Sequence, residues 1–166
     1  MSETTTLTWS AVKVGDPIPR IELEITRQRL VVAAGGERDF NPLHFDDERA
    51  RAAGFEAAFA NGFFLQAVAD RAVMEFLGAA GELRRMSMRI FRPVYVGRQL
   101  SLTGSVTGRH EDAGWGVVAA TLDLCTKDGR CASVEVEGAV PTVSSAIETS
   151  GPDVSSAATS QEVEPH

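Results

Sequence analysis

The sequence has few cysteines and no excess of basic residues. Cys125 and Cys131 are the two cysteines among 166 residues, which is too few for a disulfide framework. No cluster of Cys or His accompanies them, so two small strand residues in a reducing cytoplasm are favoured over a metal site. Asp and Glu outnumber Lys and Arg by 23 to 16, which argues against a nucleic-acid surface.

Long apolar runs are also missing. No segment reaches the roughly 18 consecutive apolar residues of a membrane-spanning helix. The first ten residues, "MSETTTLTWS", lack a basic patch followed by an apolar run, so no signal peptide is predicted. We therefore expect a cytoplasmic protein without a membrane partner.

The length of the chain suits one domain with a sizeable core, which we predict over residues 1–144. From Ser145 to His166 the sequence contains no Lys or Arg and is dominated by Ala, Ser, Thr, Glu and Pro. Such a composition buries too little apolar surface to offset the entropy lost on ordering. Residues 145–166 are therefore predicted to be a disordered acidic tail.

The hydrophobic pattern predicts an α+β domain. Residues 61–77 repeat apolar side chains at spacings of three and four, giving a long helix with a wide apolar stripe. The remaining predicted elements are a strand over 21–26, a helix over 27–34 ended by Gly35-Gly36, a short helix that Asp46 or Asp47 caps and that runs through Ala53, and strands over 85–91, 99–109, 116–127 and 130–140. A helix with so wide a stripe must be wrapped, so a curved sheet around it, the hot-dog arrangement, is the natural solution, although periodicity alone leaves other α+β folds open.

An aspartate and a histidine stand five residues apart in the segment that precedes the long helix. Between Asp39 and His44, Pro42 has a fixed φ and biases Asn41 toward extended conformations, so a turn can bring both side chains together. An aspartate beside an imidazole forms a general acid–base pair that works near neutral pH. The local pattern alone leaves open a solvated loop with a structural Asn-Pro turn.

The residues around this pair carry a family resemblance. The segments "DFNPLH" (39–44), "AAGF" (52–55) and "ANGFF" (60–64) resemble the MaoC-like acyl-thioester dehydratases, also called (R)-specific enoyl-CoA hydratases. The later "MSMRIFRPVYVGRQLSLTGSV" (86–106) is similar to that family's strand–turn–strand, and the resemblance runs from about residue 9 to 142. It implies a hot-dog fold and reversible syn addition of water to a trans-2-enoyl thioester, giving a (3R)-hydroxyacyl thioester. It also implies no metal and no cofactor, since the CoA or acyl-carrier thioester belongs to the substrate.

The resemblance also implies roles for individual residues. Asp39 and His44 would form the catalytic dyad that activates water. Asn41 would hold the loop and orient one of the dyad side chains, or would be a plain turn residue before proline. Gly62 would donate its backbone N–H to the thioester carbonyl, because N–H groups in the first turn of a helix are unpaired and lie at its positive end. A tight helix start selected for packing is the alternative for Gly62.

Three residues of the long helix are predicted to border the acyl group. Phe63, Phe64 and Val68 lie near its start, although core packing is the favoured explanation for any one of them.

The sequence departs from the family pattern at several positions. Glu37-Arg38 stand where Ser-Gly is common, and Asn61 stands where many members have His. We expect an ion pair between Arg38 and either Glu37 or Asp46, with contact to a substrate phosphate as the alternative. Asp70 takes the place of a serine in some relatives and has no assigned role.

An exposed sheet edge favours at least a homodimer, and a heteromer with a related subunit is the alternative. Other functions on the same fold stay open. The protein could be an acyl-CoA thioesterase, a catalytically silent acyl-binding partner, or one subunit of a heteromeric hydratase for bulky, steroid-like enoyl-CoAs.

Overall fold

The computed structural model describes residues 7–142, and within this range the chain forms one five-stranded antiparallel sheet and three α-helices. The predicted tail, residues 145–166, lies outside the described residues. The elements in chain order are η1 (Trp9–Ala11), β1 (Pro17–Glu24), α1 (Arg27–Glu37), η2 (Pro42–His44), α2 (Asp47–Ala52), α3 (Gly62–Leu77), β2 (Glu82–Ile90), β3 (Gln99–Asp112), β4 (Trp115–Thr126) and β5 (Gly129–Pro141).

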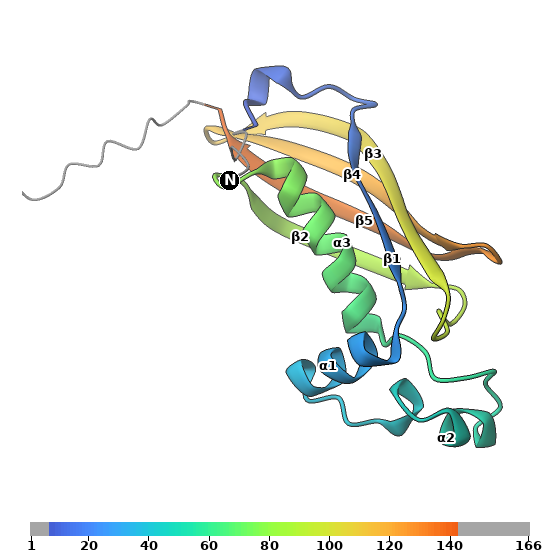
Figure 1. Ribbon diagram of the computed structural model, residues 1–166. Helices are drawn as coiled ribbons and strands as arrows, with labels where there is room; N and C mark the ends of the chain where they lie inside the picture. The colour runs from blue at the N-terminus through green and yellow to red at the C-terminus, as the bar shows by residue number, and fades with distance from the viewer. Residues whose placement is uncertain (1–6, 143–166) are drawn as a thin grey trace, which may run out of the picture.

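The sheet has the strand order β1-β3-β4-β5-β2, so β1 and β2 are its edges. It curves around α3, which crosses its concave face (Figure 1). The apolar stripe of α3 faces the sheet and is buried, while the opposite face of the helix carries its polar residues. The buried residues of the stripe are Leu65, Val68, Ala69, Ala72, Val73 and Leu77. The predicted α+β arrangement, one helix wrapped by an antiparallel sheet, is therefore confirmed.

The boundaries of the predicted sheet strands are close to the observed ones, and β1 differs most. This strand begins at Pro17 and ends at Glu24 rather than covering 21–26. Proline is tolerated there because β1 is an edge strand, where the missing N–H costs no ladder hydrogen bond. A register shift between Ile18 and Ile21 marks the irregular part of its pairing with β3.

The prediction that Gly35-Gly36 ends the first helix is wrong, because α1 continues through both glycines to Glu37. Glycine in a helix interior costs only about 1 kcal/mol relative to alanine. After the glycines, the N–H groups of Arg38 and Asp39 donate to carbonyls of the last turn. The extra turn moves the end of α1 to the residues that precede Asp39.

The segment between α1 and α3 lies at the N-terminal end of α3, where α1 and α2 also gather (Figure 1). This segment contains Asp39 and His44, so the predicted catalytic loop and the start of the central helix share one end of the molecule.

No helix within residues 7–142 combines the length and the apolar character that crossing a membrane requires.

Candidate active site

The end of α1 places Asp39. Arg38 follows the helix in the left-handed conformation, with φ 57° and ψ 28°. The N–H of Asp39 then donates to the carbonyl of Ala34 at 2.9 Å, and the N–H of Arg38 donates to that of Gly35 at 3.4 Å. This pair of bonds is the Schellman motif, which reverses the chain direction after a helix. The reversal brings the Asp39 carboxylate to the start of α3.

Because Arg38 is an L-residue in the left-handed region, its conformation is strained by about 1 kcal/mol. We expect Arg38→Gly to raise the free energy of unfolding by about that amount, since glycine adopts this conformation without a steric penalty. Urea denaturation measures the change. Ala33→Gly, within the same helix but at an ordinary helical position, should lower the free energy of unfolding by about 1 kcal/mol. If Arg38→Gly instead lowers the free energy of unfolding, the Arg38 side chain makes a contact that stabilises the fold by more than the backbone strain costs.

The proline turn places His44. Asn41 caps the short helix η2, because its Oδ1 accepts from the N–H of Leu43 at 3.2 Å. The backbone N–H of Asn41 donates to Asp39 Oδ1 at 3.3 Å. The Asn41 side chain thus holds the loop. The contact of Asn41 with Asp39 comes from its backbone N–H and not from its side-chain amide.

The imidazole of His44 is held on both sides. Its Nδ1 lies 3.0 Å from the carbonyl oxygen of Phe59, and its Nε2 lies 3.4 Å from Asp39 Oδ2. A carbonyl can only accept, so Nδ1 carries a hydrogen and Nε2 is the nitrogen that can take up and release a proton. The structure therefore brings the two predicted dyad residues together with the exchangeable nitrogen facing the carboxylate.

Asp39 is held as a carboxylate by its hydrogen bonds. Asn61 Nδ2 donates to Asp39 Oδ2 at 3.0 Å, and this bond is the largest cause of the lowered pKa of Asp39. The Asn41 N–H and the nearby His44 lower the pKa further, while partial burial opposes them. The side chains of Asp39 and His44 are 28% and 12% exposed, so a small molecule can reach the carboxylate while the imidazole is largely enclosed.

Gly62 is the first residue of α3, and its N–H has no acceptor within the helix. The N-cap Asn61 uses its Oδ1 for the N–H of Phe64, at 2.8 Å. A Cβ built on Gly62 would lie 3.6 Å from Ile90 Cδ1, which is an ordinary contact, so protein packing alone does not require glycine here. The positive end of a 16-residue helix at this position suits an oxygen that gains negative charge.

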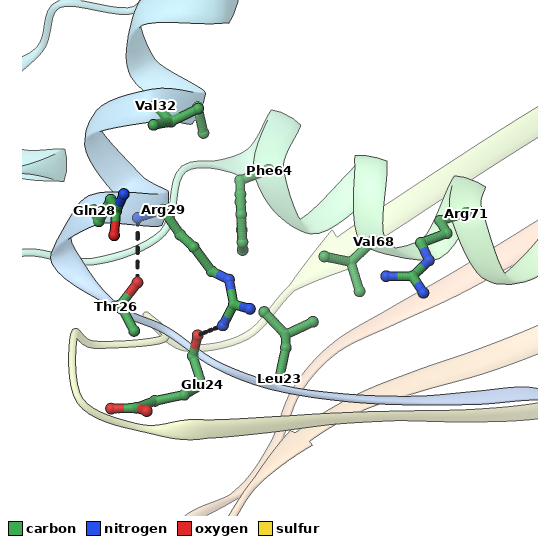
Figure 2. A pocket seen from close by; sticks show the side chains of 10 residues that line it. Leu23, Glu24, Thr26, Gln28, Arg29, Val32, Phe64, Val68 and Arg71 are labelled. Carbon is green, nitrogen blue, oxygen red and sulfur yellow. Dashed lines mark hydrogen bonds between the residues drawn. The ribbon is translucent and has the colours of Figure 1, made fainter.

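One cavity among the described residues is an open groove that neither Asp39 nor His44 lines. This open groove, of about 770 Å³, is lined by α1, the end of β1 and one face of α3 (Figure 2). Its lining residues are Leu23, Glu24, Thr26, Gln28, Arg29, Val32, Ala33, Phe64, Val68 and Arg71. Two of the predicted acyl-lining residues, Phe64 and Val68, are among them. Phe63 is not, and its side chain is 66% exposed.

The hydrogen-bond network around Asn61 was not predicted from the sequence. Asn61 donates to Glu37 Oε2 at 2.6 Å as well as to Asp39, so two departures from the family pattern contact each other. The ion pair expected for Arg38 is not among those formed by residues 7–142, because Glu37 bonds to Asn61 and Asp46 caps α2. The sequence contained a signal for this network. A side-chain amide at the start of a buried helix needs hydrogen-bond partners, and the acidic residues Glu37 and Asp39 lie in the segment before it.

Comparisons with known proteins agree with this geometry. A family model described as "MaoC like domain" matches residues 11–127, which is more than half of the chain. A curated relative is the mitochondrial 3-hydroxyacyl-[acyl-carrier-protein] dehydratase of Arabidopsis thaliana, 32% identical over 90 residues. The match covers 54% of this chain and 52% of that relative, so it spans about half the length of the relative.

Solved structures show the same fold. A chain of the ChsH1–ChsH2 complex from Mycobacterium tuberculosis superposes with a TM-score of 0.71 at 23% identity, covering 77% of this chain and 98% of that one. The (R)-hydratase from A. caviae involved in PHA biosynthesis gives a TM-score of 0.70 at 22% identity, covering 79% of this chain and 98% of that one. At these identities the likeness concerns the fold, and it confirms the hot-dog arrangement.

Proposed function

Because the chain belongs to the family of proteins with a MaoC like domain, we propose that it is a hydro-lyase that reversibly adds water to a trans-2-enoyl thioester. The product is a (3R)-hydroxyacyl thioester. The observation that carries the proposal is the pairing of Asp39 Oδ2 with His44 Nε2 at 3.4 Å, at the end of α3 where Gly62 presents its N–H. The matching of the curated dehydratase of Arabidopsis thaliana supports the same reaction class.

In the proposed reaction each group has its own step. Asp39 and His44 together bind one water molecule, which lies to the side of the 3.4 Å contact between the carboxylate and Nε2. The oxygen of this water bonds to the β-carbon while its proton passes to the dyad, and the dyad delivers a proton to the α-carbon on the same face. The Gly62 N–H donates to the thioester carbonyl, which gains negative charge as the β-carbon is attacked. Dehydration runs through the same steps in reverse.

The groove between α1, β1 and α3 is proposed to hold the acyl group. It begins at Phe64, two residues after Gly62, and its apolar lining continues along α3 to Val68. Leu23 and Val32 face the same space from β1 and α1 (Figure 2). A groove of about 770 Å³ has room for an acyl group well beyond four carbons, in line with the size range of ligand sites.

Crotonyl-CoA tests the reaction class. The protein should remove the enoyl absorbance of crotonyl-CoA without releasing free thiol, because hydration leaves the thioester intact. Thiol release would instead indicate the alternative, an acyl-CoA thioesterase on the same fold. A panel of enoyl-CoAs from crotonyl to steroid-sized, with the protein alone and with related subunits, covers the alternative of a heteromeric hydratase for bulky substrates. If no enoyl-thioester of any size is hydrated, the proposed function is wrong.

We also propose that a second copy, or a related subunit, pairs with the β2 edge. The other edge strand, β1, carries Pro17 and Pro19, which block strand addition. The β2 edge contains no proline and ends at Ile90, which is 48% exposed and lies against Gly62. Two structural neighbours are described as complexes of two different chains. Light scattering behind size-exclusion chromatography should give at least twice the mass of one chain, and an active monomer would contradict the proposal.

A further inference from the structure

Asn61 is the one buried polar residue within residues 7–142, with 6% of its surface exposed. Each side-chain atom that can form a hydrogen bond has a partner. Oδ1 accepts from the N–H of Phe64 at 2.8 Å, while Nδ2 donates to Glu37 Oε2 at 2.6 Å and to Asp39 Oδ2 at 3.0 Å. A buried amide bonded in this way holds one orientation, because turning it leaves polar atoms without partners.

The three partners also determine on which side of the Asn61 side-chain amide the NH₂ group lies. Two carboxylates can only accept, so they require the two N–H groups, and the Phe64 N–H requires the oxygen. An aspartate at position 61 would keep the size of the side chain and the cap on α3. It would, however, turn an oxygen toward Glu37 and Asp39, where like charges repel. The arrangement therefore depends on an amide rather than on a generic helix cap.

The same amide joins the dyad to the helix start. Asp39 Oδ2, which accepts from Asn61, is the atom that faces His44 Nε2 at 3.4 Å. Gly62, the next residue after Asn61, presents the N–H proposed to bind the thioester carbonyl. Asn61 thus sets the position of the carboxylate relative to both the imidazole and the helix N-terminus.

We propose that Asn61 is a positioning residue for the hydration step and that Glu37 holds its amide in the orientation that Asp39 requires. The inference rests on the proposed function, because it concerns the efficiency of that reaction. Neither residue contacts the reacting atoms. Asn61 acts through Asp39, and Glu37, the last residue of α1, acts through Asn61.

The loss of this contact has a signature in the pH profile. The titratable side chains that flank Asp39 are His44 from η2 and, through the shared amide, Glu37 from α1, while α3 contributes the neutral Asn61. The hydrogen bond from Asn61 is the largest cause that lowers the pKa of Asp39. Without it the pKa rises, so Asp39 takes up a proton at a higher pH and the acidic limb of the rate profile moves upward.

Four variants test the proposal in the full-length protein. Asn61→Asp and Asn61→Ser both keep a capping oxygen for α3, and each should lower kcat at least about tenfold, as expected for losing a hydrogen bond to a charged group. KM should change less than kcat, and the acidic limb of the kcat–pH profile should move to higher pH. Glu37→Ala should lower kcat about threefold, while Glu37→Gln, which keeps an acceptor oxygen for the amide, should restore the wild-type rate to within about twofold.

Thermal unfolding shows whether each variant is folded at the assay temperature. Wild-type kcat and an unshifted acidic limb in folded Asn61→Asp and Asn61→Ser would overturn the proposal. A second measurement does not need activity: the carboxyl ¹³C resonance of Asp39 should titrate at a higher pH in Asn61→Ser than in the wild type. An unchanged titration overturns the inference. If the wild type hydrates no enoyl thioester, the proposed function fails, and the titration still decides whether Asn61 controls Asp39.

Discussion

Asp39→Asn and His44→Ala should each lower kcat for enoyl-thioester hydration at least about a hundredfold, which is the loss expected when a general acid–base group is removed. Asp39→Asn keeps the size of the side chain but removes the charge that faces His44 Nε2 at 3.4 Å. His44→Ala removes the nitrogen that exchanges the proton. Because both residues act on one water molecule in the proposed mechanism, the double variant should be little slower than either single variant. Steady-state rates with an enoyl-CoA found active in the panel measure all three effects.

Two exposed residues of β3 provide matched controls. His110→Ala and Asp112→Asn make the same substitutions on the strand, away from the start of α3, and should keep the wild-type rate. Rates near the wild type in both Asp39→Asn and His44→Ala would place the chemistry elsewhere. An equal loss in the control variants would show that the substitutions act through folding.

Gly104→Ala should lower the free energy of unfolding by about 3 kcal/mol, the upper part of the range for an overpacked site. Gly104 lies in β3 between β1 and β4, where it pairs with Ile18 and Leu122. A Cβ there would lie 2.6 Å from the carbonyl oxygen of Thr121 and 3.0 Å from Leu122 Cα. Both are backbone atoms of the neighbouring strand, so β3 and β4 must separate locally to admit the methyl group. Urea denaturation at a fixed protein concentration measures the change.

Gly108→Ala is the matched control on the same strand. Its Cβ would meet Ala119 Cβ at 3.6 Å, which is an ordinary contact. Since glycine within a strand is less stable than alanine by about 0.5–1 kcal/mol, Gly108→Ala should be neutral or stabilising. Equal losses in Gly104→Ala and Gly108→Ala would mean that strand flexibility, rather than the close approach of β4, determines the effect.

Much of the site could be predicted because its signals are local. Pro42 has a fixed φ and biases Asn41 toward extended conformations, so the turn that brings His44 back toward Asp39 is a property of six consecutive residues. The start of α3 follows from the capping residue Asn61 and the apolar repeat after it. Placing Gly62 at a helix N-terminus therefore required no knowledge of the sheet.

Other features depend on contacts between distant residues. The two glycines predict an earlier end for α1, whereas in the structure the helix continues to Glu37 and ends where Arg38 and Asp39 donate hydrogen bonds to the preceding turn. The exposure of Phe63 beside the lining residue Phe64 depends on which face of α3 meets α1 and β1. Neither outcome follows from a local pattern, because neighbouring aromatic residues in a helix point to different faces.

The sequence by itself determined the class of the fold, the central helix and the loop that carries Asp39 and His44, because hydrophobic periodicity and proline chemistry act over a few residues. Only the tertiary structure decided which side chains surround the dyad. Glu37 and Asn61 are 24 residues apart, and their 2.6 Å hydrogen bond forms because α1 and α3 meet at one end of the sheet. A buried amide must satisfy its hydrogen bonds with whatever the fold brings to it, and here the fold brings it the proposed catalytic carboxylate.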